Sequence, residues 1–226
     1  MKILPLIFAA VSIAMPVVTQ RTGLSKKYGF PLKMLCACLY LVTGIISVAA
    51  SAEVTDYSLM ILGGLILGML GDFFLEYKAK SFFPLGVVFF ALGHLVYSVS
   101  FLFIGAYRAS VHISAVLGIT AAVTALVVIL AKTKLKLKGK KNMLLIYAPV
   151  LIFSFVCAAV KGAVAFYEGN ALFALCLISA GTLFFASDIM IGIGKGGIKR
   201  PKILHNAVSY TYFAAQSLFA LSIYFQ

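Results

Sequence analysis

The chain has 226 residues, of which 63% are hydrophobic and 11% are charged, whereas soluble domains carry about 25% charged residues. This composition excludes an ordinary soluble domain and predicts an all-α multipass membrane protein, with one transmembrane domain over residues 1–226. Continuous apolar runs without alternation argue against a membrane β-barrel. The formal net charge of +13 does not indicate nucleic-acid binding, because the basic residues cluster between the apolar segments.

Eight apolar segments approach the ~20 residues that a helix needs to cross a bilayer. They cover residues 2–18, 33–51, 58–77, 82–104, 110–131, 143–162, 171–193 and 203–225. The first segment, with Lys2 before a short apolar core, also resembles a cleaved signal peptide. No Ala-x-Ala site follows it and the apolar run continues through Val18, which favours a retained first helix.

The basic residues predict the orientation of these helices. Sixteen of the 19 Lys and Arg lie in or beside the first, third, fifth and seventh connections. The three exceptions are Lys2 at the start of the chain, and Arg108 and Lys161, which we assign to the other connections. By the positive-inside rule the odd connections are cytoplasmic and both termini lie outside. The short connections and compact size favour a bacterial cytoplasmic membrane.

Two carboxylates are the main candidates for function. Among the six acidic residues, only Asp72 and Asp188 lie clearly within apolar segments. A charged side chain inside a membrane segment is costly and usually marks a functional site, although pairing with a nearby Lys or His for structural reasons is the alternative. The third and seventh segments run in the same direction. Each Asp lies about five residues before the cytoplasmic end, at a depth of about 8 Å.

Small residues and a weak internal similarity suggest how these helices pack. Gly64, Gly68 and Gly71 recur on one helix face, which lets another helix approach closely and turns Asp72 away from lipid. Residues 65–72 and 181–188 both end in small residues before Asp. A four-plus-four repeat would place the third segment against the seventh and the fourth against the eighth. Chance similarity between apolar sequences is the alternative.

Few other polar residues lie in the apolar segments. The candidates for supporting or substrate-binding roles are His94, Tyr97, Asn206, Tyr210, Tyr212 and Gln216. At most two histidines lie near the aspartates, so a three-His zinc site is not indicated, and no metal or other cofactor is predicted. The four cysteines lie in apolar segments without a C-x-x-C pair and are predicted to pack as free thiols. The glycine-rich residues 192–197 lack the Walker spacing and indicate a flexible connection.

The ordered set of motifs resembles the YhhN family of multipass proteins, which includes the lysoplasmalogenases. The matching stretches are Leu70–Leu75, Gly86 with Gly93–Tyr97, Ala186–Asp188 and Tyr212–Gln216, so the resemblance covers nearly the whole chain. Family members often have Lys directly before the Pro at position 31. Here Phe30 precedes it, and Lys33 is a possible substitute.

This resemblance implies a membrane hydrolase that cleaves the vinyl-ether bond of lysoplasmalogens to a fatty aldehyde and a glycerophospho-alcohol. Two close carboxyl groups can share a proton and divide acid and base roles, so Asp72 and Asp188 are the candidate catalytic dyad. The partners are then a lysophospholipid and the bilayer. The basic residues that could hold the headgroup phosphate are Lys33, Lys78, Lys80, Lys199 and Arg200.

Two other functions fit parts of the pattern. A proton-coupled transporter of small molecules or lipids would use Asp72 and Asp188 as proton carriers, and an internal repeat would suit it. An intramembrane aspartyl protease shares the Gly71-Asp72 pair. However, Met69 replaces the first glycine of its Gly-x-Gly-Asp signature, and no Pro-Ala-Leu motif follows.

Overall fold

The chain folds into a bundle of helices that follows the predicted segments in order. The computed structural model describes residues 3–76, 82–105, 112–133, 141–195 and 202–226. Within these residues there are eight long helices, one single-turn helix (α2) and no strand. The helices are α1 (Leu4–Arg21), α2 (Leu24–Lys27), α3 (Gly29–Ala50), α4 (Asp56–Glu76), α5 (Phe83–Phe103), α6 (Ile113–Thr133), α7 (Lys141–Tyr167), α8 (Ala171–Lys195) and α9 (Lys202–Phe225). The all-α prediction is therefore confirmed.

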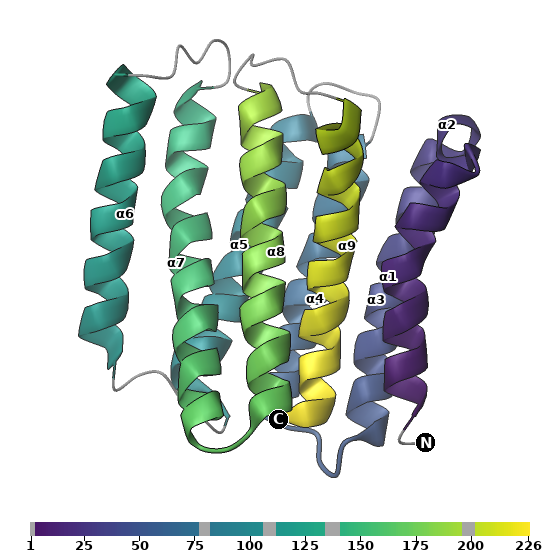
Figure 1. The fold of residues 1–226 in the computed structure, drawn as a ribbon, viewed down its shortest axis with the longest axis horizontal. Coiled ribbons are helices and arrows are strands. Elements are labelled where there is room, and N and C mark those ends of the chain that lie inside the picture. The colour runs from purple at the N-terminus through teal and green to yellow at the C-terminus, as the bar shows by residue number, and fades with distance from the viewer. Residues whose placement is uncertain (1–2, 77–81, 106–111, 134–140, 196–201) are drawn as a thin grey trace.

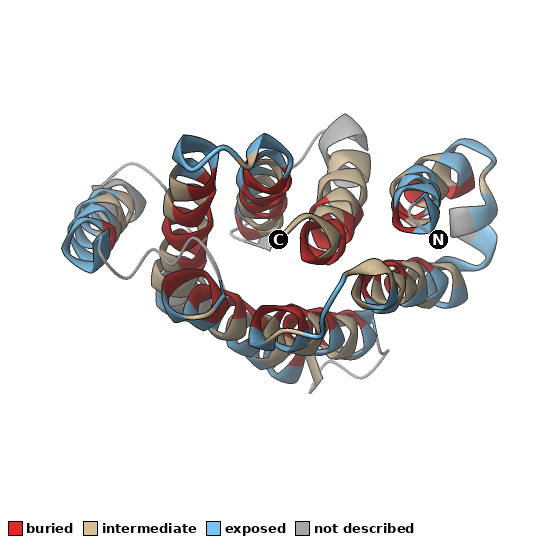
Figure 2. Cartoon of the chain, turned by 90° about the horizontal axis from the view of Figure 1, so that it is seen from below, coloured by how far each residue is buried: buried red, intermediate tan, exposed pale blue. Residues whose placement is uncertain are grey.

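The long helices stand in two layers (Figures 1 and 2). One layer contains α6, α7, α8, α9 and α1 in that order, and the other contains α5, α4 and α3. Buried residues gather between the layers, whereas the outward faces are exposed (Figure 2). The residues available for chemistry therefore lie between the layers.

The chain reverses direction at each long helix, as Figure 1 shows. Helices α1, α4, α6 and α8 end at the upper end of the bundle, and both termini lie at the lower end. The connections predicted to carry most of the basic residues thus join helices at one common end. Which side of a membrane this end faces remains a prediction.

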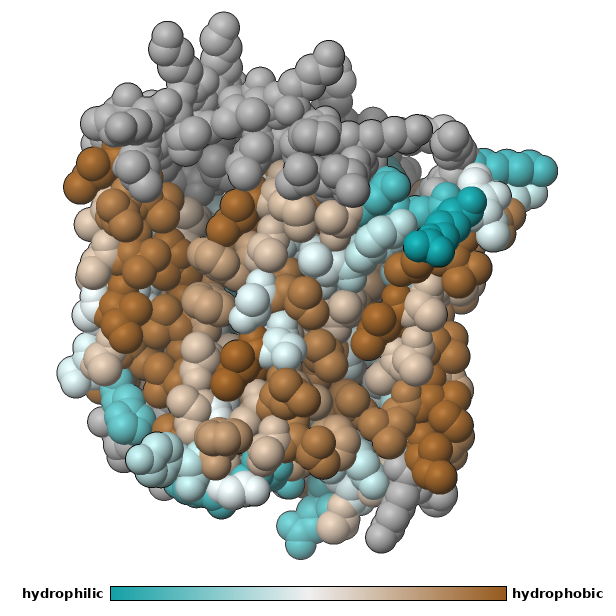
Figure 3. Space-filling model, in the orientation of Figure 1, coloured by the Kyte–Doolittle hydropathy of each residue, from teal (hydrophilic) through white to brown (hydrophobic). Residues whose placement is uncertain are grey.

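Six of the helices are long and apolar enough to cross a membrane: α1, α3, α4, α5, α7 and α8. The apolar part of α6 that the structure describes is shorter, Ile113–Ile129, and the described part of α9 does not meet the same standard. In Figure 3 hydrophobic side chains cover much of the visible face, and the most hydrophilic ones lie along its lower edge and at the upper right. These features support a multipass membrane protein, and the count of eight spans remains a prediction.

The glycine face of α4 brings it into close contact with neighbouring helices. A Cβ atom at Gly64 would lie 2.1 Å from the ring of Tyr97 on α5, and one at Gly71 would lie 2.8 Å from the ring of Phe90. A Cβ at Gly68 would lie 2.3 Å from Gln216 on α9. The predicted close packing of this face is confirmed.

The predicted pairing of helices is not confirmed. Single side chains do meet between the predicted partners: the Tyr57 ring of α4 contacts the Phe173 ring of α8, and the Tyr97 hydroxyl of α5 donates to Gln216 of α9. Within the described residues, however, α4 packs mainly on α5, and α8 packs mainly on α7 and α9. The reason is local: the glycines that permit close approach lie on the α4 faces toward α5 and α9. The predicted repeat is not confirmed.

The assignment of Lys161 to a connection is also wrong. Lys161 is fully buried within α7. Its Nζ donates hydrogen bonds to the carbonyl oxygens of Ser100 at 3.3 Å and Ile104 at 2.8 Å, at the end of α5, and lies 4.7 Å from the Tyr57 ring centroid. The last carbonyls of a helix lack intrahelical partners and carry partial negative charge, so they can hold a cation away from water.

Candidate active site

Asp72 is buried near the upper end of α4, with 2% of its surface exposed. It follows Gly68 by one helical turn and therefore lies on the same face, toward α9. The absence of a side chain at Gly68 leaves space beside it for Tyr212 and Gln216. The sequence thus places Asp72 where two polar side chains of α9 can enter.

Both carboxylate oxygens of Asp72 have a partner. Lys33 Nζ, from α3, lies 3.3 Å from Oδ1, and the Tyr212 hydroxyl donates to Oδ2 at 2.7 Å. Lys33 also lies 3.4 Å from Oε2 of Glu76, which is at the exposed end of α4. The Lys33 ammonium therefore neutralises a buried carboxylate and an exposed one, so it is not a free phosphate ligand.

A chain of hydrogen bonds continues from Asp72 toward the middle of the bundle. Gln216 Nε2 donates to the Tyr212 hydroxyl at 3.1 Å, and the Tyr97 hydroxyl donates to Gln216 Oε1 at 2.8 Å. Tyr97 and Gln216 are fully buried. These contacts fix the Tyr212 hydroxyl so that it donates to Asp72, which makes Tyr97 and Gln216 supporting residues of this carboxylate.

Asp188 has a different set of partners. His94 Nε2, from α5, lies 3.3 Å from Asp188 Oδ2, and the Tyr147 hydroxyl of α7 donates to the same oxygen. The side chains of His94 and Asp188 are 3% and 7% exposed. No Lys or Arg of the described chain pairs with Asp188, so among these contacts its only potential cationic partner is His94.

The two carboxylates lie in separate clusters. Within the described residues no hydrogen bond or ion pair joins Asp72 to Asp188; the partners of each are those given above. Aromatic rings lie between the clusters. The Phe184 ring contacts that of His94 at a centroid distance of 4.5 Å and that of Tyr212 at 5.4 Å. The two carboxylates therefore share no direct hydrogen bond in the described part of the chain.

The aspartates lie at similar but unequal depths. Asp72 is four residues before the end of α4 at Glu76, and Asp188 is seven residues before the end of α8 at Lys195. At 1.5 Å per residue these offsets are about 6 Å and 10 Å from the same end of the bundle. Both carboxylates thus lie in the half nearer the basic connections.

The remaining predicted residues divide into two groups. Asn206 and Tyr210 are half-buried on α9 and hydrogen-bond to neither aspartate. Tyr210 precedes Tyr212 by two positions, which turns it to another side of the helix. The other candidate phosphate ligands, Lys78, Lys80, Lys199 and Arg200, lie outside the described residues.

Sequence reasoning missed Tyr147 and Glu76. Tyr147 is a tyrosine near the start of an apolar segment, and nothing in its spacing distinguishes it from a packing residue. Glu76 follows Asp72 by one helical turn, a spacing that predicts a shared face. That spacing is the one signal that would have connected Glu76 to the site.

The structure also places the cysteines and the potential metal ligands. All four cysteines are free; Cys36, Cys157 and Cys176 are buried, whereas Cys38 is exposed on the outer face of α3. Within the described part of the chain no three His, Cys, Asp or Glu residues gather in a way that could hold a metal ion. The polar groups gathered around the two aspartates are an imidazole, phenols and the Lys33 ammonium.

One family model matches the chain. The family model described as "YhhN family" matches residues 2–223, nearly the whole chain. The protein belongs to the YhhN family. No curated protein and no solved structure matches it significantly. Membership of the YhhN family is consistent with a membrane hydrolase. In this member the carboxylates of Asp72 and Asp188 are buried in the bundle.

Proposed function

We propose that this YhhN protein hydrolyses the vinyl-ether bond of lysoplasmalogens. The observation that supports this most directly is the pair of buried carboxylates with unlike partners in the same half of the bundle, Asp72 with Lys33 and Asp188 with His94. Cleavage of a vinyl ether needs a proton donor and a fixed negative charge, and unlike surroundings are how one fold supplies both.

In the proposed reaction a proton first adds to the vinyl carbon remote from the ether oxygen. The resulting oxocarbenium ion is stabilised by a nearby carboxylate, and water then adds to the cationic carbon. The hemiacetal that forms collapses to a fatty aldehyde and a glycerophospho-alcohol. Water is the only other reactant, and no redox cofactor takes part in this scheme.

Asp72 is the better candidate for the fixed negative charge. Its two oxygens accept from Tyr212 and pair with Lys33, so a carboxylate is the form that satisfies both neighbours. Asp188 has no such cation fixed beside it and belongs to the cluster that supplies the proton. The shallow position of both suits a lysolipid whose glycerol lies near the membrane interface, with its chain along the apolar interior. The phosphate would meet the basic connections.

Single substitutions test this proposal. Asp72→Asn and Asp188→Asn should each lower aldehyde release from a vinyl-ether lysolipid by about 10²-fold or more, because each removes one of the two functions. Asp56→Asn, on the exposed first turn of α4, is the matched control and should retain activity. The assay compares vinyl-ether, ester and alkyl-ether lysolipids with the purified protein in detergent.

The same preparation distinguishes hydrolysis from transport. If both Asp→Asn variants keep full aldehyde release, the carboxylate pair is not catalytic. If the wild type releases no aldehyde but drives proton-coupled uptake into vesicles, these carboxylates serve a transporter instead.

A further inference from the structure

His94 is the most unusual polar group in the Asp188 cluster. The ring lies on α5 with 3% of the residue exposed, and only its Nε2 has a partner, Asp188. Nδ1 is buried and has no hydrogen-bond partner among the described residues. Buried polar atoms nearly always have a partner, so an orphaned ring nitrogen at a candidate site indicates a position for an atom that binds there.

The contacts of Asp188 determine what this free nitrogen can do. Asp188 Oδ2 accepts from Tyr147 and lies next to His94 Nε2, which fixes the Nε2 proton on the side of the carboxylate. In the neutral ring Nδ1 is then an acceptor, and in the charged ring it is a donor. Nδ1 is thus the ring atom free to exchange a proton with a third group.

The Asp72 cluster cannot supply the proton equally well. Both of its oxygens are engaged, one by an ammonium and one by a hydroxyl donor, so a carboxylate is the form that satisfies both neighbours of Asp72. The Phe184 ring contacts His94 of one cluster and Tyr212 of the other, and it offers an apolar wall for an alkenyl chain. A vinyl-ether double bond along this wall would have His94 on one side and Asp72 on the other.

We propose that His94 is the catalytic acid and base of this site, acting through Nδ1, with Asp188 and Tyr147 as positioning residues. The inference rests on the proposed vinyl-ether hydrolysis. The Nδ1–H bond breaks as the C=C electron pair forms a new C–H bond at the remote vinyl carbon. An oxygen lone pair completes the oxocarbenium ion, which Asp72 stabilises.

The second half of the reaction restores His94. Water adds to the oxocarbenium carbon and gives a proton back to Nδ1, forming the hemiacetal. The hemiacetal hydroxyl proton passes to the leaving oxygen as the C–O bond breaks. One lysolipid and one water become one aldehyde and one alcohol, and the imidazolium is regenerated.

The test compares His94→Gln with His112→Gln, a control at the exposed start of α6. Glutamine can keep a hydrogen bond to Asp188 but cannot carry the proton, so kcat should fall about 10²- to 10⁴-fold. Binding of a non-hydrolysable alkyl-ether lysolipid should change less than about threefold. Tyr147→Phe should lower kcat with KM unchanged, and His112→Gln should match the wild type.

A wild-type measurement keeps the inference testable if His94→Gln fails to fold. The kcat of the wild type should fall as the pH rises, because a general acid acts only while it carries its proton. A kcat that does not depend on pH, or His94→Gln that retains kcat, would overturn the role of His94 alone. Absence of aldehyde release by the wild type would overturn the proposed function and this role with it.

Discussion

The residue one turn before each aspartate determines which partner that aspartate acquires. Gly68 precedes Asp72, and its missing side chain gives room to Tyr212 and Gln216. Phe184 precedes Asp188 by the same four positions, and its ring packs against His94 instead. A tyrosine hydroxyl donates to each carboxylate, but Lys33 pairs with Asp72 and His94 with Asp188, which gives two acids of the same type different chemistry.

The glycine face of α4 leads to a prediction about stability. Gly64→Ala should lower the free energy of unfolding by about 1–3 kcal/mol, because the added methyl would lie 2.1 Å from the Tyr97 ring, which other residues hold in place. Gly63→Ala is the matched control, since the atom nearest to its new Cβ is 3.9 Å away. Thermal unfolding of the purified variants in detergent measures both effects. Equal midpoints for the two variants would contradict the close α4–α5 contact.

At the scale of elements, Lys161 connects α7 to the end of α5. The last carbonyls of α5 lack partners within their helix, and the Lys161 ammonium donates hydrogen bonds to two of them. The Tyr57 ring of α4 lies beside the ammonium. Tyr57 in turn hydrogen-bonds to Ser222 of α9 at 2.8 Å. Four helices therefore meet around one cation at the end of the bundle opposite the aspartates.

Replacement of Lys161 should destabilise the bundle without changing the contacts of Asp72 or Asp188. Lys161→Met should lower the free energy of unfolding by about 1–3 kcal/mol, since it leaves buried carbonyls of α5 without partners. Lys27→Met, on the exposed single-turn helix, is the control and should unfold like the wild type. Thermal unfolding followed by circular dichroism reports the difference. A variant as stable as the wild type would show that Lys161 does not support the end of α5.

The elements themselves could be predicted largely from the sequence, but their pairing could not. Apolar length located all eight long helices, and the apolar surroundings of Asp72 and Asp188 singled out both residues. Packing partners are decided by shape at single positions such as Gly64 and Gly71, which an apolar sequence does not rank. For the same reason the sequence singles out neither Tyr147 nor α5 as the main packing partner of α4.

At the scale of the whole molecule, the partners of each aspartate come from both halves of the chain, which we call the crossed arrangement. Asp72 of α4 is held by the preceding long helix, α3, and by α9, which follows the other aspartate. Asp188 of α8 is held by the preceding helix, α7, and by α5, which follows Asp72. Each half of the chain therefore completes the carboxylate site of the other half.

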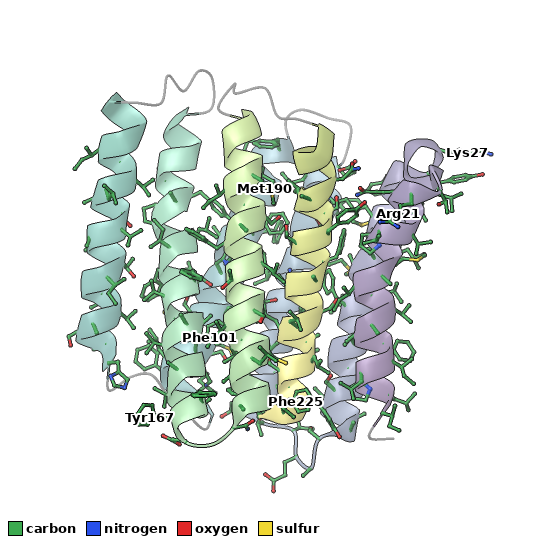
Figure 4. All side chains as sticks on the ribbon, viewed as in Figure 1. Arg21, Lys27, Phe101, Tyr167, Met190 and Phe225 are labelled. Carbon is green, nitrogen blue, oxygen red and sulfur yellow. The ribbon has the colours of Figure 1, made fainter. Side chains whose placement is uncertain are left out.

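The arrangement of the helix ends predicts accessibility across the membrane. Lys27 lies at the upper end of the bundle, and Tyr167 lies at the lower end, next to Glu168 (Figure 4). Lys27→Cys and Glu168→Cys should react with a membrane-impermeant maleimide from opposite sides, Glu168→Cys from outside. The parent for labelling carries Cys38→Ala, because that thiol is exposed on α3. Reaction of both cysteines from one side would contradict the transmembrane topology.

The crossed arrangement also has a consequence for how the protein is made. Because α4 leaves the ribosome well before α9, Asp72 meets the bilayer when Tyr212 does not yet exist. Lys33 of α3 is already synthesised by then and is the partner available to this carboxylate during insertion. We expect this ion pair to form first, and the hydrogen bond from Tyr212 to be added when α9 arrives.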